Sequence, residues 1–240
     1  MKKAEKGRVY LVGAGPGDPE LLTLRAAALI QSADFIFHDD LVAPEILHHA
    51  SDQATVKNVG KRCGDKSITQ DDINALLIHH ARAGHSVVRL KTGDPMLFGR
   101  AGEEIDALEA AAVPFEIVPG ITAGFAAASA VHAALTDRRH ASKVIVLTGH
   151  RANSGKPDWG PLPTDATLII YMPGPDYAHL AEQITGSGLK PQTPCIIVSS
   201  VATPQEQTLR TTVSKLAQTS ALPAPCVILV GNALVAKGIR

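Results

Sequence analysis

Short apolar runs alternate with amphipathic segments through the first half of the chain. The run Val9–Gly13 is apolar up to its closing glycine, which is typical of a buried strand, and the segment 19–32 that follows has the spacing of a helix. Thr69 is a candidate N-cap for a second helix that extends to residue 84. The remaining elements are expected as strands at 34–37, 56–60, 87–91 and 115–118 and a helix at 101–112. This alternation indicates an α/β domain with a largely parallel sheet.

The pattern changes near residue 120. A helix of small apolar residues is expected at 122–134, and strands then dominate, with one further helix at Tyr177–Gly186. The expected strands are 143–148, 167–172, 195–200, 208–212 and 227–230, and the segment 151–166 is expected to be a surface loop. A strand-rich second half favours a mixed sheet. The sequence therefore predicts two α/β domains, residues 1–120 with a parallel-rich sheet and residues 121–240 with a mixed one.

The loop after the first strand is rich in glycine. Gly13 and Gly15, with an acid about twenty residues later at Asp39, outline a dinucleotide-binding turn. The outline is incomplete, because Asp18 stands where a third small residue is needed and its charge would repel a pyrophosphate. Pro16 also removes a backbone N–H that a phosphate cradle requires. The loop is better suited to a ligand that is not a diphosphate.

Composition narrows the range of partners. The 240 residues carry equal numbers of basic and acidic side chains, so charge gives no reason to expect a nucleic acid or a membrane surface as partner. No apolar run has the length of a bilayer span or of a signal peptide, and we expect a cytoplasmic protein. The three cysteines are far apart and the histidines lack ligand spacing, which favours reduced thiols and no metal site.

A set of short motifs occurs in a fixed order along the chain. They lie at 13–24, 59–62, 89–95 with 98–100, 118–123, 135–138, 147–150, 171–172, 202–205 and 230–231. Together they closely resemble the motifs of the tetrapyrrole methylases, which methylate corrin and sirohaem precursors with S-adenosylmethionine. The resemblance is greatest for members that act on uroporphyrinogen III. It implies two methyl transfers, to rings A and B, that give precorrin-2 for sirohaem or cobalamin synthesis.

The same resemblance implies an architecture. Two α/β domains are expected with the active cleft between them, S-adenosylmethionine as co-substrate, a small tetrapyrrole as substrate and a homodimer as the assembly. Some relatives carry a dehydrogenase–chelatase domain ahead of the methylase. This chain begins almost at the first methylase strand, so we expect that additional activity to be absent here.

Two positions match the residues that the family uses to move protons. Asp39 follows a predicted strand, at the end where α/β active sites gather, and the resemblance gives it the role of proton acceptor. Lys61 follows another predicted strand and matches the proton donor of the family. Asp40 stands where relatives usually carry arginine, so the sequence leaves open which of the two adjacent acids acts.

The resemblance places the cofactor site on loops and strand ends of both domains. Thr92, Gly93 and Asp94 match a Gly-Gly-Asp motif that contacts the cofactor, with threonine in the first position. If that position needs φ > 0, a branched residue there is strained, and the added hydroxyl would be able to donate a hydrogen bond to the cofactor carboxylate. The other cofactor positions implied are Pro16, Leu97, Thr122, Ala123, Met172, Val201 and Cys226.

A substrate rich in carboxylates needs several cations. Arg62, Arg100 and Arg138 are the candidates that we select, because the arginine fork matches a carboxylate. Departures from the family pattern occur at Asp137, where relatives usually show histidine, and at 199–200, where two serines replace a Glu-Asn pair. Three alternatives therefore stay open: a later precorrin methylase, a nicotinamide-dependent oxidoreductase, and a paralogue that binds a tetrapyrrole without turning it over.

Overall fold

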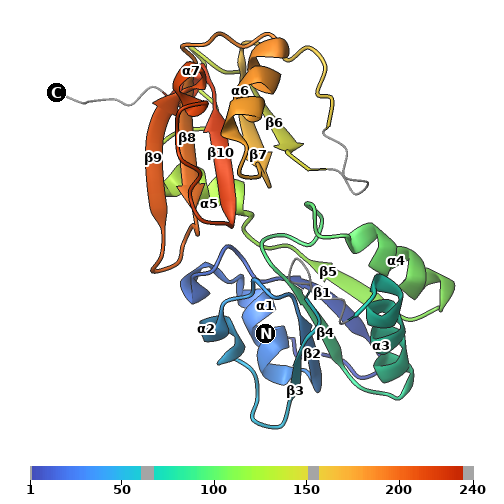
Figure 1. The fold of residues 1–240 in the computed structure, drawn as a ribbon. Helices are drawn as coiled ribbons and strands as arrows, with labels where there is room; N and C mark the ends of the chain where they lie inside the picture. The colour runs from blue at the N-terminus through green and yellow to red at the C-terminus, as the bar shows by residue number, and fades with distance from the viewer. Residues whose placement is uncertain (1, 61–67, 151–156, 235–240) are drawn as a thin grey trace. The chain divides into compact units, whose positions relative to one another are not determined.

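Each half of the chain folds around its own five-stranded sheet. The structure, a computed structural model, describes residues 2–60, 68–150 and 157–234. It divides into two units, Met1–Thr122 and Ala123–Arg240 (Figure 1). The prediction of two α/β domains, one with a parallel sheet and one with a mixed sheet, is confirmed.

The sheet of the first unit is parallel, with the strand order β3-β2-β4-β1-β5. Its strands are β1 (Val9–Gly13), β2 (Phe35–His38), β3 (Thr55–Asn58), β4 (Val87–Lys91) and β5 (Phe115–Val118). Every residue of the neighbouring strands β1 and β4 is buried. This burial on both faces explains why β1 is a continuous apolar run and does not alternate with polar residues.

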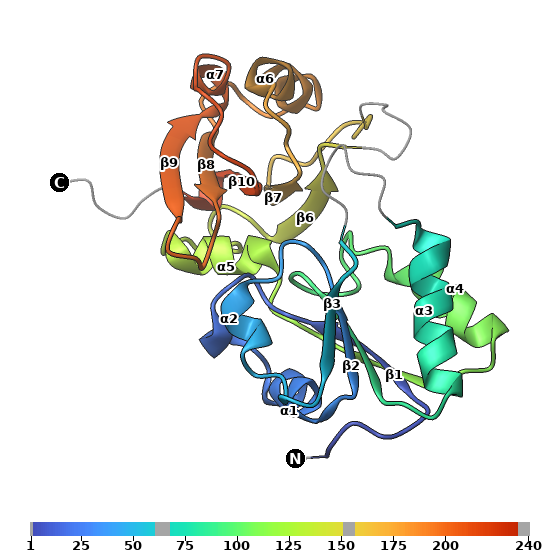
Figure 2. The same ribbon diagram turned by 60° about the horizontal axis from the view of Figure 1, so that its bottom comes forward.

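Helices cover both faces of this first sheet (Figure 2). Tyr10 and Val12 of β1 point into one core and Leu11 into the other, as the two-residue period of a strand requires. The first core is closed by α1 (Leu24–Ser32) and α2 (Pro44–Leu47), and the second by α3 (Gln70–Arg82) and α4 (Ala101–Ala110).

The helix expected over residues 19–32 is divided in two. A 3-10 turn, η1 (Pro19–Leu21), comes first, and Asp18 caps it because its carboxylate accepts the backbone N–H of Glu20 at 2.8 Å. Thr23 then begins α1, because its hydroxyl accepts a backbone N–H at 3.1 Å. Asp18, which breaks the dinucleotide pattern in the sequence, thus acts as a helix cap.

The sheet of the second unit is mixed, with the order β6-β7-β10-β8-β9. Its strands are β6 (Lys143–Thr148), β7 (Ala166–Tyr171), β8 (Pro194–Ser199), β9 (Gln207–Thr212) and β10 (Cys226–Val230). β6 and β7 are parallel, whereas β10 is antiparallel to both β7 and β8, so β7 and β8 run in the same direction. α5 (Ala123–Ala130) packs on one face, and α6 (Tyr177–Gly186) and α7 (Val213–Leu216) pack on the other (Figure 1).

Most element boundaries agree with the sequence prediction to within two residues. The predicted cap of α3 is confirmed, since Thr69 and Asp72 form a reciprocal capping box. The helix expected over 122–134 ends at residue 130, and the single-turn helices α2 and α7 were not expected. Among the helices that the structure describes, none is both long enough and apolar enough to cross a bilayer.

Candidate active site

The first candidate region lies at the carboxyl end of the parallel sheet, where β1 and β4 are neighbours. The helix after β1 packs on one face of the sheet, and the helix after β4 packs on the opposite face. Adjacent strands whose connections leave toward opposite faces mark the place where α/β proteins bind their ligands. Several of the predicted site residues follow β1, β2 or β4 at this end, so the topology brings them together.

The loops after β1 and β4 are hydrogen-bonded to each other. The N–H of Gly15 donates to the carbonyl of Gly93 at 3.2 Å, and the N–H of Gly93 donates back at 2.8 Å. Gly93 has a φ of 70°, which favours glycine. Pro16, the next residue of the first loop, is buried. Two predicted cofactor positions, Pro16 and Gly93, therefore belong to one connected piece of backbone.

A third loop, after β5, packs against the same place. A Cβ added to Gly120 would lie 2.2 Å from the carbonyl oxygen of Gly93, and one added to Gly13 would lie 2.5 Å from the nitrogen of Gly120. Asp94 links these loops, since Oδ2 accepts the N–H of Gly120 at 3.0 Å and Oδ1 accepts that of Met96 at 2.8 Å. The glycines are needed because three backbone segments meet without room for a side chain.

Thr92 does not have the strained backbone that the family motif suggested. Positive φ occurs at Gly93 and not at Thr92, so the condition under which strain was expected at this threonine is not met. The Thr92 hydroxyl is buried and has no hydrogen-bond partner among the described residues. Leu97, further along the loop, is half-buried and donates its N–H to the carbonyl of Asp94 at 3.3 Å. Thr122 is the last residue of the first unit.

The two adjacent acids after β2 have different surroundings. Asp39 donates its backbone N–H to the carbonyl of Leu90 at 3.0 Å, and its carboxylate accepts from Arg89 and, at 3.4 Å, from the N–H of Thr92. Asp40 accepts from the side-chain amide of Asn58 at 3.1 Å, at the end of β3. Asp39 thus faces the β4 loop that carries the predicted cofactor motif. Asp40 is directed toward the neighbouring strand end.

Three further charged residues lie behind Asp39, and the sequence analysis gave them no role. Arg89 and Lys91 of β4 both bind Glu104 of α4, and all three side chains are almost fully buried. Burial and the nearby charge of Arg89 lower the pKa of Lys91. Burial also opposes the charge of Arg89, but the carboxylates of Asp39 and Glu104 outweigh it and raise the pKa of Arg89. The sequence signal for this cluster was the presence of two charged residues, Arg89 and Lys91, at alternate positions of an otherwise apolar strand.

The basic residues that the sequence analysis selected come from both units of the chain. Lys61 and Arg62 lie outside the described residues. Arg100 begins α4 with a φ of 56° and forms an exposed ion pair with Glu103 at 2.6 Å, which raises the pKa of Arg100. Arg138 is exposed in the second unit.

The second candidate region is one edge of the mixed sheet. β7 and β8 end at this edge and β10 begins there, so Met172, Val201 and Cys226 are all brought to it. α5 starts nearby, because the N–H of Gly124, the residue after Ala123, donates to the hydroxyl of Tyr171 at 2.8 Å. The structure therefore gathers four predicted cofactor positions of the second unit.

This edge is shaped by unusual backbone torsions. Met172, Ser200 and Ala202 have φ values of 49°, 48° and 57°, which residues other than glycine adopt at a cost of about 1–2 kcal/mol each. Val201 lies between two of them and is buried. Backbone strain of this kind concentrates at functional sites and requires support from the surrounding structure.

Cys226 and the serine at 199 share one backbone acceptor. The Cys226 thiol and the Ser199 hydroxyl both donate to the carbonyl of Pro223, the thiol at 3.0 Å. Burial raises the pKa of the Cys226 thiol, which favours its protonated form.

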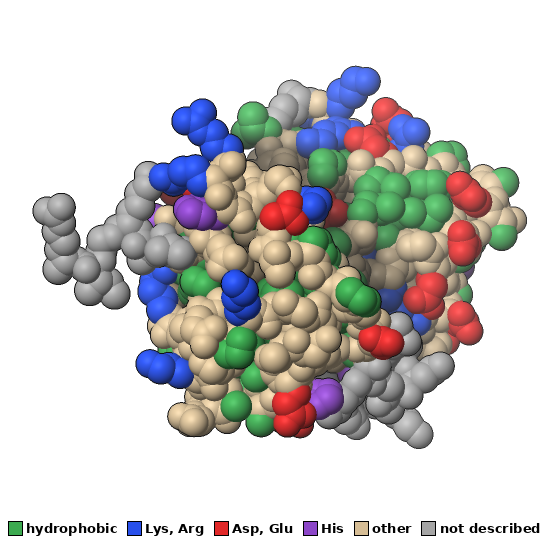
Figure 3. All heavy atoms as spheres, turned by 90° about the horizontal axis from the view of Figure 1, so that it is seen from above, with side chains coloured by type: hydrophobic (Ala, Val, Ile, Leu, Met, Phe, Trp, Pro, Cys, Tyr) green, Lys and Arg blue, Asp and Glu red, His purple; other side chains and the backbone are tan. Residues whose placement is uncertain are grey.

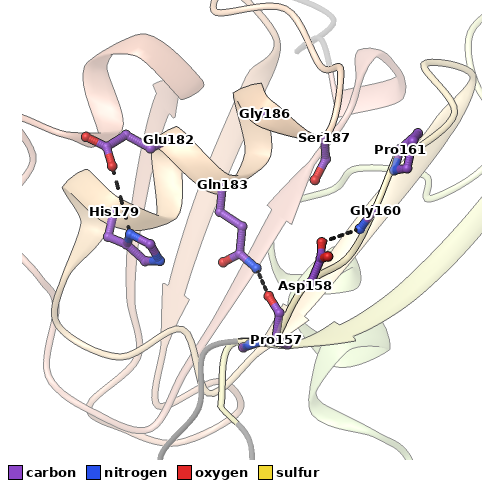
Figure 4. Close-up of a pocket in the computed structure, with 9 residues that line it drawn as sticks. All are labelled: Pro157, Asp158, Gly160, Pro161, His179, Glu182, Gln183, Gly186 and Ser187. Carbon is purple, nitrogen blue, oxygen red and sulfur yellow. Dashed lines mark hydrogen bonds and ion pairs between the residues drawn. The ribbon is translucent and has the colours of Figure 1, made fainter.

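A separate surface pocket of about 510 Å³ lies beside α6 and contains none of the predicted site residues (Figure 4). Gln183 and His179 of α6 line it, opposite the segment that follows residue 156. Figure 3 shows one face of the molecule, on which both basic and acidic side chains are exposed. Within the described ranges, no cluster of three histidine, cysteine or acidic side chains has the arrangement of a metal site.

Comparison with known sequences shows a match along most of the chain. A family model described as Tetrapyrrole (Corrin/Porphyrin) Methylases matches residues 8–217. Siroheme synthase 2 of Aeromonas hydrophila is 42% identical over 238 residues, which is 98% of this chain and 51% of that protein. The uroporphyrinogen-III C-methyltransferase of Paracoccus denitrificans is 43% identical over 236 residues, 96% of this chain and 82% of that protein. The chain spans about half the length of the siroheme synthase.

Solved structures agree with these matches. The uroporphyrin-III C-methyl transferase of Thermus thermophilus complexed with S-adenyl homocysteine has a TM-score of 0.83 and 37% identity, covering 94% of this chain and 98% of that one. A cobalt precorrin-4 methyltransferase of cobalamin biosynthesis has a TM-score of 0.81 and 29% identity, covering 95% and 96%.

Proposed function

The chain belongs to the tetrapyrrole (corrin/porphyrin) methylases, and we propose that it transfers methyl groups from S-adenosylmethionine to carbons of uroporphyrinogen III. The observation that carries this proposal is the position of Asp39. It is a partly exposed acid at the carboxyl end of the parallel sheet, hydrogen-bonded to the loop with the predicted cofactor motif. Identity of 43% to a uroporphyrinogen-III C-methyltransferase supports the choice of substrate.

The chemistry needs positioning and a proton acceptor. S-adenosylmethionine supplies an activated methyl group, because its sulfonium becomes a neutral thioether when the methyl leaves. The acceptor carbon of the pyrrole forms the new C–C bond and the ring system then loses a proton. We propose that the Asp39 carboxylate accepts that proton and that Lys61 acts as the proton donor. Arg62, Arg100 and Arg138 would hold the substrate carboxylates.

The cofactor positions fit an adenosyl compound better than a dinucleotide. The tight contact of Gly13, Gly93 and Gly120 leaves no side chain over the strand ends, so backbone groups are within reach of a ligand. Asp18 places a negative charge on the loop where a diphosphate would have to bind, and Pro16 offers no N–H. Pro16, Thr92, Asp94, Leu97 and Thr122 from the first unit, with Ala123, Met172, Val201 and Cys226 from the second, complete the proposed cofactor set.

The product would be precorrin-2, after two transfers, and it would enter sirohaem or cobalamin synthesis. We also propose that the reaction takes place in the cytoplasm, and that the enzyme is a homodimer, as the family resemblance implies. A later precorrin methylase is the second candidate, favoured by the likeness to a cobalt precorrin-4 methyltransferase and by the substitutions Asp40, Asp137 and 199–200. Mass analysis with uroporphyrinogen III as acceptor separates the two, since a later enzyme would leave it unmodified.

The cofactor class has its own test. Calorimetric titration should show binding of S-adenosylhomocysteine and none of NAD. Binding of NAD without binding of S-adenosylhomocysteine would overturn the proposal and restore the oxidoreductase alternative.

A further inference from the structure

Four charged side chains form a connected cluster in the first unit, and the proposed function uses only one of them. Arg89 and Lys91 lie on β4, Glu104 lies on α4, and Asp39 follows β2. The side chains of Arg89, Lys91 and Glu104 are 4%, 1% and 0% exposed, whereas that of Asp39 is 28% exposed. Three charges are thus buried behind one that reaches the surface.

The hydrogen bonds of the cluster hold Arg89 in a single orientation. Its Nε donates to Oε1 of Glu104 at 2.9 Å, and its Nη1 donates to the carbonyls of Phe37 at 3.4 Å and Leu90 at 3.2 Å. Its Nη2 donates to Oδ1 of Asp39. The planar guanidinium therefore bridges two carboxylates with different nitrogens, which a lysine ammonium does not reproduce.

Glu104 is held just as firmly. Nζ of Lys91 donates to its Oε1 at 3.0 Å and to its Oε2 at 2.9 Å, and the amide of Gln70 approaches Oε1 at 3.4 Å. With Arg89, these donors occupy both oxygens. Glu104 is thus a fixed anchor for Arg89, and Lys91 balances its charge.

Asp39 is fixed on one side only. Oδ1 is bound by Arg89, while Oδ2 has a long contact of 3.4 Å with the N–H of Thr92. The cluster orients the carboxylate and leaves its second oxygen weakly engaged, as a proton acceptor requires.

Burial of three charged side chains costs desolvation free energy. Val87 and the side chains of α3 and α4 on the same face form an apolar core, and well-packed apolar residues in place of a buried ion pair are often neutral or stabilising. Ionisable groups whose pKa values are shifted by burial and by charged neighbours, as for Arg89 and Lys91, occur often at functional sites. We propose that Arg89 is a positioning residue for Asp39, and that Glu104, balanced by Lys91, holds Arg89 in place. This inference rests on the proposed function of Asp39 as proton acceptor.

A double-mutant cycle tests the inference. Arg89→Lys should lower kcat for methyl transfer by about 10–100-fold, because misplacement of a reacting group by about 1 Å has an effect of that size, while KM for S-adenosylmethionine changes little. In an Asp39→Asn background, Arg89→Lys should have no further effect on kcat. Equal losses in both backgrounds would show that Arg89 acts independently of Asp39, and the proposal would be wrong.

A pair of glutamates on α4 supplies the matched control. Glu104→Gln should reduce kcat as Arg89→Lys does, whereas Glu109→Gln, at an exposed position of the same helix, should leave it unchanged. Equal activity of the two glutamine variants would contradict the proposal. If Glu104→Gln does not fold, as judged by the absence of a thermal transition, the cycle with Arg89→Lys still decides.

A structural measurement separates this inference from the proposed function. If the wild-type protein transfers no methyl group to uroporphyrinogen III, the proposed function has failed, and crystal structures then test the cluster. In Arg89→Lys the Asp39 carboxylate should leave its wild-type position while the pairing of β2 with β4 persists. An unmoved Asp39 would overturn the role of Arg89.

Discussion

The two candidate regions at the strand ends, one in each unit, differ in the residues that form them. In the first unit, glycine backbone and charged groups dominate: Gly93 and Gly120 touch without room for a Cβ, and Asp39 and Asp94 accept several hydrogen bonds. In the second unit the gathered side chains are mostly apolar, and the shape comes from left-handed torsions at residues such as Met172. In the proposed function, the first region would move protons and the second would supply apolar contacts to the cofactor.

The largest expected effect concerns the acid of the first region. Asp39→Asn should lower kcat by about a hundredfold or more, with the Kd of S-adenosylhomocysteine changed by no more than about twofold, because a general base acts on the reaction and not on cofactor binding. Methyl-transfer assays and calorimetry measure the two quantities. Asp40→Asn is the matched control and should stay active, since Asp40 hydrogen-bonds to Asn58. An active Asp39→Asn beside an inactive Asp40→Asn would move the role by one residue.

The close backbone contact of the first region should respond strongly to a single methyl group. Gly120→Ala should lower the free energy of unfolding by about 3 kcal/mol, because the new Cβ meets backbone and not a flexible side chain. Gly102→Ala, on α4 with open space around it, should raise that free energy by about 0.5–1 kcal/mol. Urea denaturation measures both. Equal stabilities would mean that the glycine contact is not tight.

The second region should show the opposite behaviour, with stability gained when strain is removed. Met172→Asn should raise the free energy of unfolding by about 1 kcal/mol, because asparagine tolerates a left-handed torsion better. The same change should weaken the binding of S-adenosylhomocysteine by loss of apolar contact. Met96→Asn is the control, an exposed methionine without positive φ, and should change stability by less than about 0.5 kcal/mol. Identical effects at the two methionines would contradict the strain account.

The smallest expected effect compares two buried hydroxyls, one in each unit. Thr92 and Thr167 each bury a hydroxyl without a partner among the described residues. Replacement of either by valine should stabilise the ligand-free fold by about 1 kcal/mol, since an unsatisfied polar group is removed. Only Thr92→Val should weaken binding of S-adenosylhomocysteine, by loss of a donor to the cofactor. Superimposable binding curves for Thr92→Val and wild type would remove Thr92 from the cofactor site.

Several strands were predictable because they are short apolar runs that end at a polar or glycine residue, as in the buried β1 (Val9–Gly13) and the partly exposed β6 (Lys143–Thr148). The division of the helix expected over 19–32 was not predicted, because it depends on the hydroxyl of Thr23, which caps the start of α1. Single-turn helices such as α2 give no periodicity to detect.

The site was predictable only in part. The resemblance selected Asp39 and the cofactor positions, and strand topology gathers those of each unit at a sheet edge. The cluster behind Asp39 was not predicted, since Arg89 and Glu104 are joined by folding and not by spacing. Lys61 and Arg62 lie outside the described residues and stay predictions.

The central claim is tested most directly by counting methyl groups. The protein is incubated with uroporphyrinogen III and methyl-labelled S-adenosylmethionine, and the tetrapyrrole is analysed by mass spectrometry. We predict a product with two labelled methyl groups, on rings A and B. Unmodified uroporphyrinogen III, with the cofactor bound but not consumed, would contradict the account.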